Sequence, residues 1–362
     1  MILSGNQAVD SLLYNQMVQD AQDRLMNAQP LLFYDRIPRV NADDGEITAT
    51  FTGRVYAADI IADDQEAVVY SGGKLEFVTN SIPNIKIGTP LPQSYIARLG
   101  RLTRSQAGPG EAGIFQGWKQ RTVENQITGV RQTINALLCA MLLDSFDYNR
   151  LGVKLAGASW GMPGDLKATP SKAWTDTTST PITDILTMVD FAATKYGETL
   201  NRVTLARAQL ANIFKTDEFK AFSSGYFKVN LTGVATNVYL NENRTILSNI
   251  LNGMIIETHD TQIARVTGPN TVTTDRVQPA NKVLLTSTSD DGSSSGYDFA
   301  NAIVTESTVS SLVGGFDLGG EQFGPIGYWE GRLNPPDLTA WSVARGFPRK
   351  HRPTASAVLT VG

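Results

Sequence analysis

Side chains able to carry out chemistry are scarce in this sequence. It has two histidines, His259 and His351, which lie in different regions, and it contains no HExxH, CxxC, G-x-S-x-G or Walker motif. His259 stands between Glu257 and Asp260, so its imidazole could serve as a general base oriented by either carboxylate. A histidine beside acids at a strand end is more often structural or solvated, and no nucleophile lies at a recognisable spacing from this one. We therefore expect no catalytic residues and no cofactor.

Three acidic stretches could supply oxygen ligands to a hard metal ion. They are ADDGE from Ala42, ADDQE from Ala62 and SDDGSSSGYD from Ser289. None of them places its carboxylates at the alternating positions that a calcium-binding loop requires. We therefore expect two solvated turns and a surface loop, and no metal site.

The composition is that of a globular chain with a substantial core, since 41% of its 362 residues are hydrophobic. The formal net charge of −4 argues against a protein whose main task is to neutralise nucleic-acid phosphates. The one cysteine, Cys139, lies in an apolar stretch where we expect a buried thiol, and no disulfide can form within the chain. The first residues lack the pattern of a signal peptide, and the best apolar run, residues 136–143, is too short to span a bilayer. We therefore expect synthesis in a cytoplasm and no membrane contact.

The longest periodic stretch runs from residue 123 to 146 and reads VENQITGVRQTINALLCAMLLDSF. Its apolar residues recur at steps of three and four, which predicts one amphipathic helix of roughly 36 Å. One face of the predicted helix is expected to be packed in the protein core, and it holds Val130, Ile134, Leu137 and Met141. The opposite face is expected to be wet and holds Glu124, Asn125, Thr128, Arg131, Gln132 and Asn135.

An arm and a strand-rich excursion precede this helix. Residues 6–26 predict an amphipathic helix, and residues 31–40, LLFYDRIPRV, predict an apolar extended segment that needs a surface to lie on. From residue 45 to about 104 the pattern has period two, which predicts successive strands. The best hairpin joins AVVY to KLEFV around Gly72 and Gly73. An excursion of this kind exposes strand edges that a neighbouring subunit can cover.

A compact α/β subdomain of about 120 residues is predicted beyond the long helix. Its first helix has Thr180 as N-cap, Pro181 in the first position and Gly197 at its end. A strand from Leu200, a helix from residue 206, and strands around residues 255 and 284 follow.

The C-terminal region returns to strand and ends in a β-like tail over residues 355–361. It also holds the strongest basic patch of the chain. A solvated rim is the default expectation for such a patch, and contact with phosphate or with an acidic neighbour is the alternative. The patch consists of Arg345, Arg349, Lys350, His351 and Arg352.

The order of arm, β excursion, long helix, inserted α/β subdomain and final β return resembles the major capsid proteins of tailed phages, which have the Hong Kong 97 type fold. Within that group the chain is similar to the lambda-type capsid protein E family. Three stretches carry the resemblance and occur in the family's order: IPNIKIGTPLPQSYIARLGRL from Ile82, ITDILTMVDFAATKYGETLNRVTLARAQLANI from Ile182, and PPDLTAWSVARGFPRKHRPTASAVLTV from Pro335.

The resemblance implies an α+β chain of the Hong Kong 97 type. Residues 1–44 would be an N-terminal arm, 45–105 an extended β loop, 106–180 with 300–362 a peripheral domain containing the spine helix, and 181–299 an axial domain. Function would then reside in contacts between subunits. The residues expected to take part are Leu31, Phe33, Tyr34, Lys74, Arg345, Arg349, Lys350 and Arg352.

The resemblance also implies the partners. The chain would assemble with itself as hexamers and pentamers into an icosahedral shell in the host cytoplasm, and would enclose double-stranded DNA in the virion without sequence-specific binding. A portal protein, a separate scaffolding protein and a decoration protein would complete the set, since no leading segment here resembles a fused scaffold. Lys74 is the one lysine near the expected loop tip, and we expect non-covalent assembly rather than cross-linking through it.

Three other classes of protein are alternatives for this chain. An encapsulin-like nanocompartment shares the fold and would enclose protein cargo. A soluble α/β enzyme would leave the arm and the β excursion without a purpose. A tail-tube component is disfavoured because such chains are generally dominated by strands.

Overall fold

The computed structural model describes twelve stretches of the chain, which are residues 31–41, 47–52, 74–79, 84–90, 109–150, 153–158, 160–226, 237–268, 271–287, 296–304, 326–333 and 336–362. The predicted helix over residues 6–26, the AVVY strand, and the acidic stretches from Ala42, Ala62 and Ser289 lie outside or largely outside them. The chain divides into two compact units. The first comprises Met1–Glu46, Thr79–Leu137 and Phe299–Pro348, and the second comprises Ile47–Val78, Leu138–Asp298 and Arg349–Gly362.

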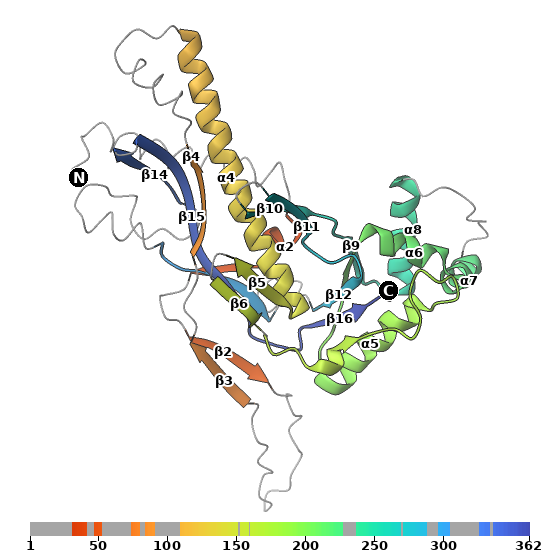
Figure 1. Cartoon of the computed structure of the whole chain (residues 1–362). Helices are drawn as coiled ribbons and strands as arrows, with labels where there is room; N and C mark the ends of the chain where they lie inside the picture. Colours follow the sequence, from red (N-terminus) through yellow and green to blue (C-terminus); the bar gives the residue numbers. More distant parts are fainter. Residues whose placement is uncertain are drawn as a thin grey trace, which may run out of the picture. The chain divides into compact units, whose positions relative to one another are not determined.

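The long helix is present and is longer than predicted. It is α4, which spans the 35 residues Pro109–Leu143 (Figure 1). It ends at Leu143 rather than at residue 146, and strand β5 begins at Phe146. Val130, Ile134 and Met141 are buried, whereas Leu137 is half-buried.

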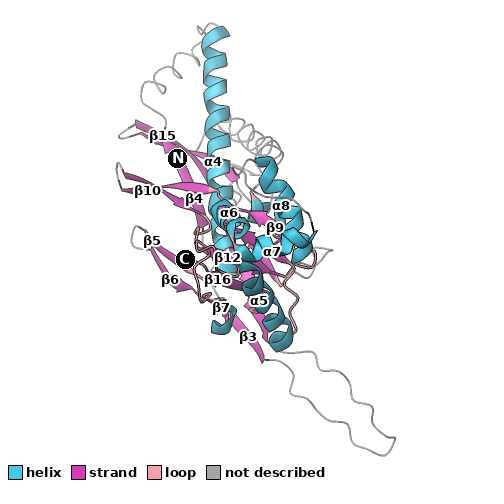
Figure 2. Ribbon diagram, turned by 90° about the vertical axis from the view of Figure 1, so that its right-hand side faces the viewer, coloured by secondary structure: helices cyan, strands magenta, loops and turns pink. Residues whose placement is uncertain are grey.

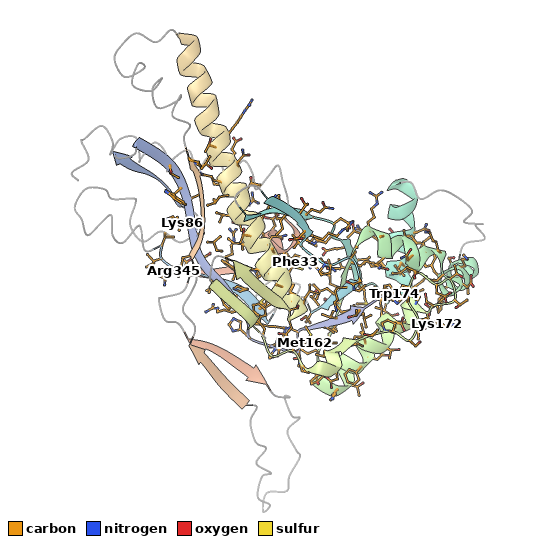
Figure 3. All side chains as sticks on the ribbon, in the orientation of Figure 1. Phe33, Lys86, Met162, Lys172, Trp174 and Arg345 are labelled. Carbon is orange, nitrogen blue, oxygen red and sulfur yellow. The ribbon has the colours of Figure 1, made fainter. Side chains whose placement is uncertain are left out.

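Two residues of the face that we expected to be wet are buried instead. Arg131 and Asn135 hold helix α2 (Leu32–Arg36) in the first unit. Asn135 Oδ1 accepts the backbone amides of Phe33 at 3.0 Å and Tyr34 at 3.1 Å, which are N–H groups without partners inside this short helix. Figure 3 shows Phe33 beside the lower half of the α4 rod. The expectation of an extended segment over residues 31–40 is therefore wrong for its first half. That half is helical because a side chain about a hundred residues away accepts the backbone amides of its first turn.

The main sheet of the first unit combines segments that are far apart in sequence. Its strands lie in the order β1-β13-β15-β14, and β4 pairs with β15 as well. β15 runs antiparallel to both β14 and β4, whereas β1 runs parallel to β13. The strand bounds are β1 Arg39–Asn41, β4 Asn84–Pro90, β13 Tyr297–Asn301, β14 Ile326–Leu333 and β15 Pro336–Lys350.

Only part of the predicted β excursion forms a separate sheet. Strands β2 (Ile47–Thr52) and β3 (Lys74–Thr79) pair with each other, and β4 belongs to the main sheet of the first unit. Strand β3 contains KLEFV and pairs with β2, whereas the AVVY half of the predicted hairpin and its turn around Gly72 lie outside the described residues.

Strand β4 can pair with β15 because it has a glycine opposite a tryptophan. Gly88 pairs with Trp341, and a Cβ at Gly88 would fall well inside contact distance of the indole ring. Neighbouring Lys86 holds its amine 4.5 Å from the centre of the same ring (Figure 3). Beyond this pair, Gln126 Nε2 of α4 donates to Thr89 Oγ1 at 3.1 Å, so β4 also lies against the helix.

We expect Gly88→Val to destabilise the first unit by about 2 kcal/mol or more, because the added side chain forces Trp341 off its position. The measurement is the free energy of unfolding from urea titration. Gly164→Ala is the control, since nothing lies within 4 Å of the Cβ that it would add. Equal stabilities for the two variants would contradict the close packing.

A second five-stranded sheet forms the centre of the second unit. Its order is β7-β16-β12-β8-β9, with β12 antiparallel to both β16 and β8. The C-terminal strand therefore belongs to the same sheet as the strands of the α/β subdomain, which the sequence analysis did not anticipate. The strand bounds are β7 Lys167–Ala168, β8 Arg202–Leu205, β9 Ile255–Thr258, β12 Lys282–Thr286 and β16 Ser356–Thr360.

Helices gather beside this sheet in both ribbon views (Figures 1 and 2). Helix α5 confirms the predicted Pro181 at its start and the left-handed Gly197 at its end, with φ of 69°. Thr180 makes no side-chain cap. Glu218 of α7 replaces it, accepting the amides of Ile182 at 2.8 Å and Thr183 at 3.0 Å. The helix bounds are α5 Pro181–Tyr196, α6 Arg207–Lys215, α7 Asp217–Tyr226 and α8 Asn237–Ile250.

A helix and two hairpins of the second unit occur in addition to the predicted helices and strands. Helix α8 carries four asparagines, which lower helix propensity and hide its apolar spacing. The two hairpins are β5 (Phe146–Arg150) with β6 (Val153–Ala158) and β10 (Gln262–Gly268) with β11 (Thr271–Arg276). Among the helices described, none combines the length and apolar content needed to cross a bilayer.

Candidate functional site

A cluster of charged side chains in the described part of the second unit surrounds the basic segment, which we define as residues 349–352. Arg349 is buried and donates two hydrogen bonds to Asp298 of β13, from Nε to Oδ1 and from Nη2 to Oδ2, both 2.8 Å long. His351 Nε2 lies 3.0 Å from Asp298 Oδ2. Burial alone would raise the pKa of Asp298, but the hydrogen bonds from His351 and Arg349 hold it below its usual value.

Lys350 lies deeper than its neighbours, with 2% of its surface exposed. Its Nζ donates to Ser356 Oγ at 2.8 Å, and Ser356 Oγ donates in turn to the carbonyl oxygen of Leu142 at 2.9 Å. Burial lowers the pKa of Lys350 to about 7, although the charges of Asp144 and Glu198 oppose this shift.

Two further carboxylates complete the cluster. Asp144, directly after α4, accepts from Lys167 Nζ at 2.7 Å and from the amide of Trp160 at 2.5 Å. Glu198 lies 3.2 Å from Arg352 Nη1 and accepts from Thr354 Oγ1 at 2.9 Å. The basic segment thus ties the ends of α4 and α5, strand β13 and strand β16 together.

The solvated rim that we expected of the basic patch is therefore wrong for Arg349 and Lys350. Asp298 of the same chain receives Arg349, and the Ser356 hydroxyl receives Lys350. Sequence reasoning missed Asp144, Glu198 and Asp298. Asp144 directly follows α4 and Glu198 follows the Gly197 cap of α5, and a single carboxylate at such a place gives no sign of its partner. Arg345 lies apart in the first unit, half-buried, and donates to the carbonyl oxygen of Ile303 at 3.4 Å (Figure 3).

The predicted arm residues Leu31, Phe33 and Tyr34 are all buried in the structure. Arg131 of α4 stacks over the Tyr34 ring at 4.9 Å and bonds Asp35 at 3.3 Å. The Tyr34 hydroxyl accepts from Arg39 Nη1 at 2.7 Å. These residues form an internal anchor of the first unit. Lys74 begins β3, and its side chain lies outside the described part of the chain.

The residues that could have formed an enzyme site are engaged elsewhere. His259 is buried, and its backbone amide donates to Leu205. Asp260 accepts from the amide of Arg207 and pairs with Arg276, while Glu257 lies 3.2 Å from Arg202. Glu257 and Asp260, which lie beside His259 in the sequence, thus both pair with other residues.

The described residues contain no group of three or more histidine, cysteine or acidic side chains placed to hold a metal ion. Cys139 is free and fully buried, and burial raises the pKa of its thiol far above the usual range, so the reactive thiolate is suppressed.

Comparison with known proteins gives a likeness in structure without one in sequence. No model of a protein family matches the chain, and no curated protein sequence matches it. A protein of Escherichia coli CFT073 described as a prophage capsid protein is similar over 100% of both chains, with a TM-score of 0.58 and 11% identity. The chain has the Hong Kong 97-type capsid fold.

A second solved structure agrees with this fold. A phage-related protein of Bordetella bronchiseptica RB50 is similar over 95% of each chain, with a TM-score of 0.53 and 14% identity. At such identities the likeness is one of fold. The capsid fold expected from the order of the sequence segments is thereby confirmed, and the long helix α4 and the α/β sheet of the second unit are among its described parts.

Proposed function

We propose that this chain is a major capsid protein of a tailed double-stranded DNA phage and belongs to the lambda-type capsid protein E family. The observation that carries the proposal is the similarity in fold to a protein described as a prophage capsid protein over 100% of both chains. Because this likeness in fold extends over the whole of both chains, it supports a structural role rather than an enzymatic one.

The proposed activity is self-assembly. Subunits associate as hexamers and pentamers into an icosahedral shell that is built in the host cytoplasm and encloses the genome in the virion. The net charge of −4 suits a shell that must enclose DNA without binding it tightly. We also propose a portal protein, a separate scaffolding protein and a decoration protein as partners.

The domain division predicted from sequence is part of this proposal. Residues 45–105 would lie over an adjacent subunit, and residues 181–299 would meet at the centre of each hexamer or pentamer. The two-stranded sheet of β2 and β3 supports the first assignment, because a two-stranded sheet is marginally stable in water unless another surface packs on it.

The predicted assembly residues would act mainly by fixing the positions of the elements that they contact. Phe33 and Tyr34 fix α2 on α4, and Arg349 and Lys350 fix the basic segment. Their burial supports an indirect role, in which they set the shape of the surfaces that neighbouring subunits meet. Direct contact is proposed for Lys74, without a covalent cross-link.

Deleting residues 66–77 tests the assignment of the extended loop. We expect a folded subunit that forms no closed shells, because the deletion removes a surface used between subunits and leaves both main sheets intact. Negative-stain electron microscopy and circular dichroism read out assembly and folding. Lys74→Arg is the matched control and should assemble normally, since we propose no cross-link at this position. Normal shells from the deletion would overturn the loop assignment.

A further inference from the structure

We propose that Lys350 is a proton-linked clamp on the C-terminal strand, such that uptake of a proton by its buried amine loosens β16 from the second-unit sheet and loss of that proton tightens it. The inference rests on the fold and on the charges around one side chain. It therefore stands independently of whether the chain forms shells.

The position of the amine makes it a clamp. Lys350 is the last residue of β15, and Ser356, which accepts its hydrogen bond, is the first residue of β16. The bond closes the loop between the two strands, and Ser356 anchors that loop to the end of α4 through Leu142. Within the described part of the chain, Ser356 Oγ is the one hydrogen-bond partner of this amine.

The charges around the amine are already balanced without it. Asp144 has Lys167 at 2.7 Å, Asp298 has Arg349 at 2.8 Å, and Glu198 has Arg352 at 3.2 Å. Each carboxylate of the cluster therefore has its own cation. A proton on Lys350 adds a surplus charge to a buried site, and a proton on His351 adds a further one beside Asp298.

Opposing influences act on the amine, and burial prevails. Asp144 from the end of α4 and Glu198 from the end of α5 favour the charged form, whereas Lys167 of β7 disfavours it. Burial is the largest effect and lowers the pKa of Lys350 from 10.5 to about 7.

The direction of the pH dependence follows from this depressed pKa. Between pH 7 and 10.5 an opened state, in which water reaches Lys350, binds more protons than the closed state. The closed state therefore gains stability as the pH rises through this window. Below pH 7 both states are protonated, and the contribution of the neutral amine is lost.

Amide hydrogen exchange of β16 in the full-length wild-type protein tests the clamp at pH 7 and pH 9, after correction for intrinsic exchange rates. We expect the opening constant of residues 356–360 to fall by up to about 50-fold between these two values. Helix α5 serves as the internal reference and should change far less. An unchanged β16, or the same change in α5, would overturn the proposal.

Two variants sharpen the test. Lys350→Met should abolish the pH dependence of β16, because it removes the titrating amine and retains the length of the side chain. Lys172→Met removes an exposed lysine from the loop before α5 and should behave like the wild-type protein (Figure 3). A wild-type profile in Lys350→Met would contradict the proposal. Should Lys350→Met fail to fold, the confinement of the wild-type effect to residues 356–360 decides the question by itself.

Discussion

Ile134→Asp is expected to eliminate soluble folded protein. Ile134 lies at the centre of the packed face of α4 with 2% of its surface exposed. A carboxylate there would be buried in the apolar face, and an unpaired buried charge costs about 3–5 kcal/mol, to which the loss of the apolar contacts adds. This is a large share of the roughly 5–15 kcal/mol that keeps a typical domain folded.

Thr133→Asp provides a matched control for this variant. Thr133 is the preceding residue of the same helix, but it is exposed, so the same carboxylate remains in water. We expect near-normal soluble yield and helix content for Thr133→Asp, and an intermediate effect for Leu137→Asp, since Leu137 is half-buried. Soluble yield and circular dichroism are the measurements. Normal yield of Ile134→Asp would show that the packed face of α4 does not form the core of the first unit.

Asp298→Asn is the variant with the second largest expected effect. It removes the charge that Arg349 grips with two hydrogen bonds and leaves the guanidinium buried without its counterion. Loss of one partner of a buried ion pair costs about 3–5 kcal/mol, and we expect this loss in the free energy of unfolding from urea titration. Asp217→Asn is the control, because Asp217 pairs with Lys220 at the exposed surface of α7 and should cost little. Equal losses in the two variants would contradict a special role for the buried pair.

The stability of the wild-type protein in acid should depend on the same Asp298–Arg349 ion pair. The pKa of Asp298 in the folded chain lies below its usual value of 3.8, so its stabilising contribution is complete above the pKa of the unfolded chain. That contribution is lost as the pH falls through the lower pKa of the folded chain. We therefore expect wild-type stability to approach that of Asp298→Asn in acid below about pH 4.

Local patterns in the sequence predicted the regular elements well. Helix α5 has its proline at the start and its glycine at the end, and both signals act within one turn. The apolar spacing of the long helix is equally local, although α4 extends further toward the N-terminus than the period alone indicated. The β-like tail is β16, one residue shorter at each end than predicted.

Long-range partners explain most of what the sequence could not show. Asn135 is polar in the pattern, so it was placed on the wet face, yet it caps α2 from a hundred residues away. Glu218 likewise caps α5 in place of the nearby Thr180. A pattern of polarity shows that a side chain needs a hydrogen bond, but it does not show whether water or a distant backbone amide provides it.

The charged cluster was invisible for the same reason. The run RKHR looked like a solvated patch because four basic residues in a row have no acidic neighbour in sequence. Asp298, which pairs with Arg349, and Glu198, which pairs with Arg352, come from different elements that only the fold brings together. The absence of a catalytic motif, by contrast, was apparent from the sequence at once.

Electron microscopy of the purified wild-type chain, alone and together with a co-expressed scaffolding protein, combined with its sedimentation profile and nucleic-acid content, tests the capsid proposal most directly. We predict closed shells built of hexamers and pentamers, formed without covalent cross-links. Shells filled with protein cargo would instead indicate a nanocompartment. A monomer under every condition, above all one that binds a small molecule saturably, would contradict the assembly function and return attention to His259.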